Sequence, residues 1–180
     1  MMWPAIHVFD AVLENAPAYR AAALAQPFRD VETPAGIFSG MAACADPAVP
    51  TEIATRLPGF CGRFSCFRRS PAGQPEPHYI HTDVDMGDWT AVLYLHPHPP
   101  EGDGTSFWRD RHTQAIAADH STPAMWANRE AFDRWHHVPA VFNRLVVFPA
   151  PYFHSRGLIE NYGQGHDARL IQIVFGTKES

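Results

Sequence analysis

The chain has 180 residues, of which 46% are hydrophobic and 18% are charged. This length and composition suit one globular domain with its own core and argue against intrinsic disorder. The formal net charge of −5 argues against a nucleic-acid binder, because such proteins neutralise phosphates with an excess of basic residues. Nearly all basic residues are arginines, which bind carboxylates well through two parallel hydrogen bonds.

The cysteine pattern and the N-terminus bear on location. The three cysteines, Cys44, Cys61 and Cys66, form no CxxC pair and are odd in number, which argues against a disulfide scaffold. The first residues lack a basic segment followed by an apolar one, so no signal peptide is predicted. No apolar run approaches the roughly 20 residues that span a bilayer. We therefore expect a soluble, cytoplasmic protein with no membrane or nucleic-acid partner.

The first 60 residues favour helices. Residues 10–26 are rich in helix formers, with Asp10 as a possible N-cap, Pro27 as a stop and Pro17 as a break between two pieces. A second short helix is expected to begin at Thr51 and to end near Pro58 and Gly59. Both helices precede the residues that suggest chemistry, so we interpret this region as a helical support packed against a sheet.

Short β-type segments follow from Gly62 onward. Proline- and glycine-rich stretches separate several of them, and many short strands with such turns indicate a sandwich or a barrel. The predicted strands cover residues 62–67, 78–84, 89–95, 105–109, 143–148 and 168–175.

One helix is predicted inside this β region. Thr122 and Pro123 resemble an N-cap followed by proline at the first helical position. We therefore expect residues 123–137 to form an inserted helix over one end of the β-domain, where it would shape the choice of substrate.

A metal site is suggested by three residues. His81 and Asp83 lie two positions apart in a predicted strand, so their side chains would point to the same face. His154 follows the apolar strand RLVVF and can supply a third ligand. Two imidazoles and one carboxylate form a facial triad, which leaves positions on the metal open for other ligands. An HxD triplet is weak by itself, and the order of strands and glycine-rich turn around it strengthens the hypothesis.

The sequence context resembles a known superfamily. HYIHTDVDMGDWTAVLYLHPHPPEGDGTSFW, and later the stretch from Asn143 to Phe175, resemble the iron(II)/2-oxoglutarate-dependent dioxygenases, especially the prolyl-4-hydroxylase-like branch. The resemblance implies a mainly β double-stranded β-helix, also called a jelly-roll or cupin-like fold, with flanking N-terminal helices. We expect one domain over residues 1–180, with helical support in 1–60 and the β-helix core in 61–180.

The resemblance also implies roles for individual residues. His81, Asp83 and His154 would hold Fe(II), while Arg169 would bind the distal carboxylate of the cosubstrate 2-oxoglutarate with help from the Tyr94 hydroxyl.

Three features depart from the family pattern. His96 replaces the usual asparagine, a Gly-Asp-Gly-Thr turn that starts at Gly102 replaces Gly-Gly-x-Thr, and the interval between His154 and Arg169 is longer than usual. Arg156 is the rival carboxylate binder.

The resemblance implies an O2-dependent hydroxylase for a small acid, an amino acid or a peptide side chain, with desaturation and ring closure as other outcomes. Two other classes stay open: a cupin-type metalloenzyme that does not use 2-oxoglutarate, and a non-catalytic small-acid-binding domain of the same fold. Nothing in the sequence indicates an oligomeric state.

Several nearby residues have both a functional and a structural interpretation. Tyr79 would share the metal-facing side with His81 and could line the pocket or belong to the core, whereas Asp85 lies too far along the strand to be a ligand. Trp108, Arg109 and Arg111 could form the rim of the substrate pocket or have no role in binding.

Overall fold

The structure is a computed structural model that describes residues 5–34, 36–77, 79–120 and 128–179. It is mainly β, with two antiparallel sheets that face each other and two α-helices, which confirms the expected fold class. The strands are β1 (His7–Phe9), β2 (Arg29–Thr33), β3 (Gly36–Ala43), β4 (Phe60–Ser70), β5 (Trp89–Tyr94), β6 (Gly104–Asp110), β7 (Phe132–Pro139), β8 (Leu145–Pro149), β9 (His154–Arg156) and β10 (Arg169–Lys178). Three 3-10 turns are η1 (Val84–Met86), η2 (Arg129–Ala131) and η3 (Gly165–Asp167).

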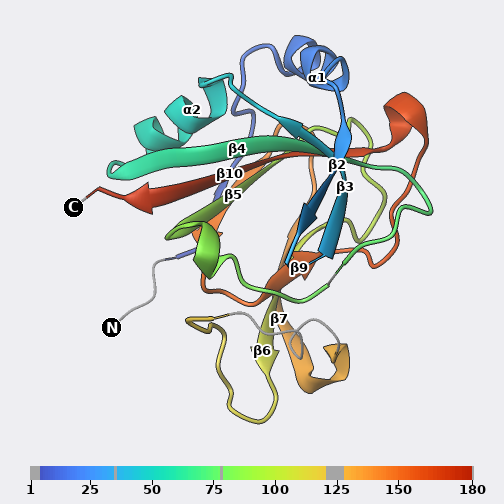
Figure 1. The fold of residues 1–180 in the computed structure, drawn as a ribbon. Helices are drawn as coiled ribbons and strands as arrows, with labels where there is room; N and C mark the ends of the chain where they lie inside the picture. Colours follow the sequence, from blue (N-terminus) through green and yellow to red (C-terminus); the bar gives the residue numbers. More distant parts are fainter. Residues whose placement is uncertain (1–4, 35, 78, 121–127, 180) are drawn as a thin grey trace.

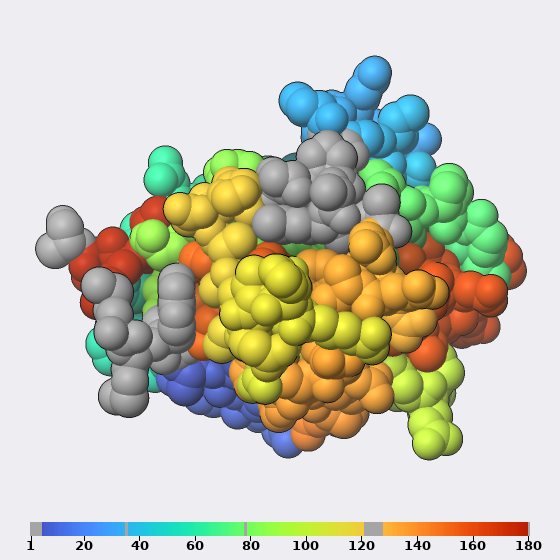
Figure 2. All heavy atoms as spheres, turned by 90° about the horizontal axis from the view of Figure 1, so that it is seen from below, coloured from blue at the N-terminus to red at the C-terminus, as the bar shows by residue number. Residues whose placement is uncertain are grey.

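The larger sheet has seven strands and the smaller sheet has three. The larger one runs in the order β1-β8-β5-β10-β4-β3-β2, and every neighbouring pair is antiparallel. The smaller one runs β7-β6-β9. In Figure 1 the larger sheet spans the upper part of the molecule and β6 and β7 lie below it. Seen from below, the yellow and orange segment that contains β6 and β7 occupies the middle of the face (Figure 2).

Both helices cover the outer face of the larger sheet. Helix α1 (Ala16–Leu24) and helix α2 (Ala48–Arg56) lie above it, on the side away from the smaller sheet (Figure 1). The apolar side chains of both helices and of the sheet form one buried cluster, which includes Ala23, Val49, Ile53, Phe67, Leu93 and Leu170. Neither helix in the described ranges is long and apolar enough to cross a membrane.

The helix boundaries differ from the sequence prediction. Helix α1 is capped by the side chain of Asn15, which accepts a hydrogen bond from the Ala18 N–H, rather than by Asp10. Pro17 therefore lies in the first turn, where its missing N–H would have no partner in the helix, and it does not divide the helix. Helix α2 begins at Ala48 instead of Thr51 and ends before Pro58 as expected.

The first 60 residues also supply strands. Strands β2 and β3 extend one edge of the larger sheet next to β4, and β1 forms its other edge next to β8. The region expected to be only helical support thus forms part of the sheet. The composition of β3, GIFSGMAA, hides this strand because alanine and glycine are depleted in typical strands.

The inserted helix predicted over residues 123–137 is wrong where the structure describes it. Residues 129–131 form the turn η2, and β7 pairs with β6 from Asp110 opposite Phe132 to Gly104 opposite Pro139. Residues 123–127 lie outside the described residues. The burial of Phe132 and Val138 and the exposure of most residues between them fit a sheet edge. Pairing with β6 therefore overrides the helix-start signal.

The register of the larger sheet defines what faces the smaller one. Paired residues on neighbouring antiparallel strands point to the same side. Tyr94, Ile171 and Arg68 thus form one row across β5, β10 and β4, on the same side as a second row of Thr90, Phe175 and Phe64. Tyr94 and Ile171 belong to the buried cluster between the two sheets.

Phe107 on β6 tests this inter-sheet core. Its side chain is 0% exposed and packs edge-on against Phe148 with ring centroids 5.0 Å apart. Phe107→Ala should lower the free energy of unfolding by about 3–5 kcal/mol in denaturant titrations, because it leaves a cavity between the sheets. Val141→Ala, at a side chain that is 42% exposed, is the control and should change it by less than about 0.5 kcal/mol. Equal effects of both would contradict this packing.

Candidate metal centre

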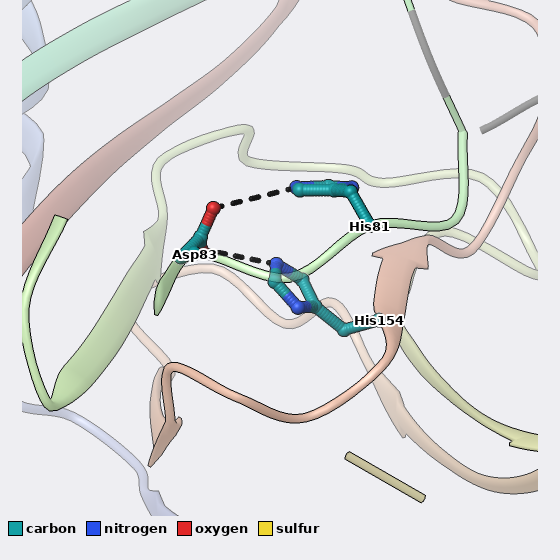
Figure 3. A group of neighbouring side chains, drawn as sticks. All are labelled: His81, Asp83 and His154. Carbon is teal, nitrogen blue, oxygen red and sulfur yellow. Dashed lines mark ion pairs between the residues drawn. The ribbon is translucent and has the colours of Figure 1, made fainter. Parts of the chain in front are cut away.

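Three side chains converge between the two sheets. One possible ligand atom from each of His81, Asp83 and His154 lies within 4.8 Å of the others, and all three point toward one another in Figure 3. Asp83 Oδ1 is 3.6 Å from His81 Nε2, and Asp83 Oδ2 is 3.1 Å from His154 Nε2. The structure shows no second cluster of histidine, cysteine or acidic ligands within the residues that it describes.

The backbone fixes the two histidines opposite each other. His81 and His154 form an isolated antiparallel bridge in which each N–H donates to the carbonyl of the other, at 3.0 and 2.9 Å. The predicted strand over residues 78–84 is reduced to this bridge. The Asp83 N–H donates to the carbonyl of Ala150 at 2.8 Å, and the chain then turns into η1. Asp83 therefore reaches the site at the start of a turn rather than by regular strand alternation.

Both imidazole rings are held by the nitrogen that faces away from Asp83. His81 Nδ1 lies 3.0 Å from the carbonyl oxygen of Tyr79, and His154 Nδ1 lies 2.9 Å from that of Tyr152. Because a carbonyl only accepts, Nδ1 of each ring carries a proton, and Nε2 is left to hydrogen-bond Asp83 in the metal-free protein or to offer its lone pair to a metal. This arrangement is common for metal-ligating histidines, whose second nitrogen is hydrogen-bonded to fix ring orientation.

Asp83 is ionised in this setting. Burial raises the pKa of its carboxyl, but the two imidazoles and the hydrogen bonds from His154 and Thr90 outweigh burial and hold the pKa below its usual value. The Thr90 hydroxyl donates to Oδ2 at 2.8 Å, so β5 orients the carboxylate. Two imidazole nitrogens and one carboxylate oxygen suit a first-row divalent metal, and their placement on one side leaves other positions open.

Arg169 lies in the same interior. Its side chain is 6% exposed, and its Nε donates to both oxygens of Asp103, at 3.1 and 3.3 Å. Burial lowers the pKa of Arg169, but Asp103 and Tyr162 more than offset it and the pKa is raised. The Tyr162 hydroxyl donates to Asp103 Oδ2 at 2.6 Å. The two terminal nitrogens of Arg169 have no hydrogen-bond partner in the described part of the chain, so its planar end remains available.

The Gly-Asp-Gly-Thr turn has a structural reason. Gly104 has a φ of +144°, and a Cβ on it would lie 2.1 Å from the carbonyl oxygen of Val138. A glycine is therefore required where β6 begins, and the residue before it supplies the carboxylate for Arg169. Thr105, the last residue of the turn, lies 2.6 Å from the Tyr94 hydroxyl through its own hydroxyl oxygen. Tyr94 is 1% exposed, and burial raises its pKa, so it remains protonated.

Arg156 is held differently from Arg169. It donates from Nε to the carbonyl oxygen of Ile159 at 3.0 Å, and its Nη2 also donates to that oxygen. Its Nη1 lies 3.8 Å from Glu76 Oε2, an oxygen that also accepts a hydrogen bond from Arg68. Arg68 and Glu76 were not among the residues predicted from the sequence, because their proximity to the site depends on the register of β4 and on a loop.

The remaining candidates fall mostly outside the centre. Asp85 is exposed in η1, and Arg109 and Arg111 are exposed at the end of β6. Trp108 is 5% exposed, and its indole N–H donates to the Ser155 hydroxyl at 2.9 Å, so it is a core residue. The Tyr79 hydroxyl donates to a backbone carbonyl at 3.2 Å, and its ring contacts Trp108 edge-on.

Solved structures share this fold at low sequence identity. The epimerase SnoN, in complex with Fe3+, alpha ketoglutarate and nogalamycin RO, matches with a TM-score of 0.61 and 15% identity over 97% of this chain and 78% of SnoN. HygX from Streptomyces hygroscopicus, with nickel and 2-oxoglutarate bound, matches with a TM-score of 0.57 and 12% identity over 96% and 82% of the two chains. A Pseudomonas putida prolyl-4-hydroxylase matches with a TM-score of 0.51 and 16% identity over 97% and 92%. The fold is therefore the double-stranded β-helix of iron/2-oxoglutarate enzymes.

A family profile also matches the sequence. The match covers residues 61–169 and carries the description Family of unknown function (DUF6445). It includes the three converging side chains and Arg169. A search of the curated proteins found no match.

Removal of one candidate ligand tests the centre. Asp83→Ala should weaken Mn(II) or Fe(II) binding by more than about 100-fold, since losing a ligand costs more than losing a residue that supports one. Asp85→Ala, two residues away on the exposed turn, is the matched control and should bind the metal like the wild type. Metal content after dialysis and Mn(II) titration followed by electron paramagnetic resonance are the measurements. Equal metal content in Asp83→Ala and the wild type would refute the assignment.

Proposed function

Because this chain belongs to the DUF6445 family of unknown function, its activity is inferred from its own residues, and we propose that it is an iron(II)- and 2-oxoglutarate-dependent oxygenase. The observation that carries the proposal is the convergence of His81, Asp83 and His154 in an interior that also holds an arginine with a free planar end. Bound to the triad, iron(II) would supply the O2 chemistry that side chains lack.

The charges of this interior support a dianionic cosubstrate. Three guanidinium groups and three carboxylates lie between the sheets, and each of these side chains is at most 15% exposed: Arg68, Arg156, Arg169, Glu76, Asp83 and Asp103. The described side chains of the interior are therefore balanced before a metal binds. A divalent metal adds two positive charges in a region where uncompensated charge is costly. A ligand with two carboxylates restores neutrality, as 2-oxoglutarate does.

Arg169 is the better candidate for the distal carboxylate. Arg156 already donates to a backbone carbonyl and lies near Glu76, whereas Asp103 engages only the Nε of Arg169. A guanidinium with two free terminal nitrogens can hold a carboxylate through two parallel charge-assisted hydrogen bonds. The Tyr94 and Thr105 hydroxyls lie close to each other in the same interior and can donate further hydrogen bonds.

Apolar side chains would keep water away from the triad. Phe148 packs edge-on against the His154 ring at 4.7 Å, and Phe107 lies behind it at 0% exposure. Such walls strengthen every electrostatic interaction inside the site, because they exclude a solvent of high dielectric constant.

We propose hydroxylation as the reaction. The fold is shared by an epimerase, a carbocyclase and a prolyl-4-hydroxylase, so fold similarity does not choose among such outcomes. SnoN was solved with nogalamycin RO and HygX with hygromycin B, which favours a small-molecule substrate here as well.

Three free cysteines fit a reducing compartment, and we propose the cytoplasm.

Cosubstrate binding tests the proposal directly. Anaerobic titration of the iron(II)-loaded protein with 2-oxoglutarate should produce the weak visible charge-transfer band of the chelate. Arg169→Ala should bind several hundred-fold more weakly, since breaking a buried ion pair costs about 3–5 kcal/mol. Arg169→Lys keeps the charge but loses the two parallel N–H donors of the guanidinium group. Its affinity for 2-oxoglutarate should therefore lie between those of the wild type and Arg169→Ala.

Two controls distinguish the binding of the distal carboxylate by an arginine from the chelation of the keto acid group by the metal. 2-Oxobutyrate has the same keto acid group without the distal carboxylate, so Arg169→Ala should leave its affinity unchanged. Arg156→Ala should weaken the binding of 2-oxoglutarate less than Arg169→Ala does. A wild type without the band would refute the proposed function, and the reverse order of the two alanine variants would assign the carboxylate to Arg156.

A further inference from the structure

A surface groove lies along the turn that follows Asp83 in the chain. Its volume is about 490 Å³, and it is lined by Arg63, Phe64, Val84, Asp85, Met86, Gly87, Asp88 and Thr177. Five of these residues follow Asp83 directly in the chain, through η1 and the residues after it. The others come from the adjacent ends of β4 and β10. Along the chain, the groove therefore begins at Val84, the residue directly after the candidate ligand Asp83.

A row of paired residues connects the groove with the triad. Thr90, which donates to the Asp83 carboxylate, is opposite Phe175, and Phe175 is opposite Phe64. All three side chains point to the side of the sheet that faces the triad. Adjacent strands lie about 5 Å apart, so Phe64 is about 10 Å from Thr90 across the sheet. A molecule about 10 Å long that rests on Phe64 would span the distance to Thr90.

Aromatic and apolar side chains form one side of the groove and are open to solvent. The rings of Phe64 and Phe175 are stacked, with centroids 6.2 Å apart and planes 11° from parallel. Phe64 is 47% exposed and Met86 is 41% exposed, and only six large hydrophobic side chains among the described residues are exposed to this degree. Two of the six thus lie beside the candidate triad, where burial by a bound ring would be favourable.

The charges around the groove disfavour an anionic ligand. The guanidinium and carboxylate groups between the sheets are balanced once a divalent metal and a dicarboxylate are added, so no interior cation remains for a second anion. Among the described residues that line the groove, the single cation, Arg63, is outnumbered by the carboxylates of Asp85 and Asp88, and Asp88 accepts a hydrogen bond from the backbone N–H of Lys178 at 2.9 Å.

We infer that the groove binds the primary substrate and that this substrate is a small molecule without negative charge, with an apolar ring face that stacks on Phe64. The inference rests on the proposed function, which supplies the metal and the dicarboxylate. It assigns Phe64 and Met86 to substrate binding, roles that the sequence did not indicate.

Three naphthalene probes with the same ring and different charge test this inference. 2-Naphthol is neutral, 2-naphthoate is anionic and 2-naphthylmethylamine is cationic at pH 7. Their binding to the protein loaded with Mn(II) and 2-oxoglutarate is followed by ligand-observed nuclear magnetic resonance. Mn(II) in the triad should relax the protons of bound 2-naphthol strongly compared with diamagnetic Zn(II), because the groove lies close to the metal. The neutral and the cationic probe should both bind more tightly than the anionic one, the neutral probe by at least about tenfold.

Substitutions at Phe64 test whether the ring of 2-naphthol binds against this side chain. Phe64→Ala should weaken 2-naphthol binding about tenfold through loss of the aromatic contact, whereas Phe64→Trp should retain it. Ile37→Ala on β3, where the side chain is 57% exposed, is the matched control and should bind like the wild type. Unchanged affinity in Phe64→Ala, tighter binding of the anionic probe than of either other probe, or absence of Mn(II)-induced relaxation would each overturn the inference.

The binding of metal and 2-oxoglutarate, on which this inference rests, is measured in the same protein preparations. A wild type that forms the 2-oxoglutarate charge-transfer band but gives one of these adverse results disproves the groove alone. A wild type that binds neither metal nor 2-oxoglutarate removes the proposed function and this inference with it.

Discussion

The buried carboxylate of Asp83 is the constraint on which the centre depends. An ionised carboxylate between two sheets is costly unless it is paired and hydrogen-bonded. Here two imidazole nitrogens and the Thr90 hydroxyl surround it. These partners come from β5, from the segment before η1 and from β9, so the carboxylate joins both sheets at one point. The reciprocal bridge between His81 and His154 keeps the two rings on the same side of it. A metal ion would find its ligands oriented before it binds.

The other buried charges follow the same rule with different partners. Arg169 is paired with Asp103, which is itself bonded to Tyr162, and Arg68 is paired with Glu76. Because Arg169 and Arg68 each have a carboxylate partner, these two guanidinium groups can be buried without a ligand. Asp103 bonds only the Nε edge of Arg169, so pairing does not use the terminal nitrogens that a dicarboxylate needs. The structure thereby combines a stable interior with an open cationic group.

Local pattern explains which parts of this structure could be predicted. Apolar runs predicted β5, β8 and β10, and the HxD triplet with a distant histidine predicted the convergence of His81, Asp83 and His154. Residues 132–137 were misread as helix because the partner that makes them a strand, β6, is remote in sequence. The Asp103–Arg169 pair could not be predicted for the same reason, and the Glu76–Arg68 pair depends on the path of the loop after β4, which no local pattern indicates. Only the register of β4, β5 and β10 brings these groups into one space.

Strand β10 relates these features to one another. Arg169 begins the strand, and Phe175 lies near its other end, with both side chains facing the smaller sheet. Thr90 lies opposite Phe175 and donates a hydrogen bond to Asp83, so the Asp83 carboxylate lies nearer to Phe175 than to Arg169 along β10. A metal held by Asp83 would therefore lie between a guanidinium on one side and the aromatic rings of the groove on the other. A dicarboxylate that reached Arg169 from this metal would extend away from the groove. The rings of Phe64 and Phe175 would then remain free for a second molecule, as a reaction with two organic substrates requires.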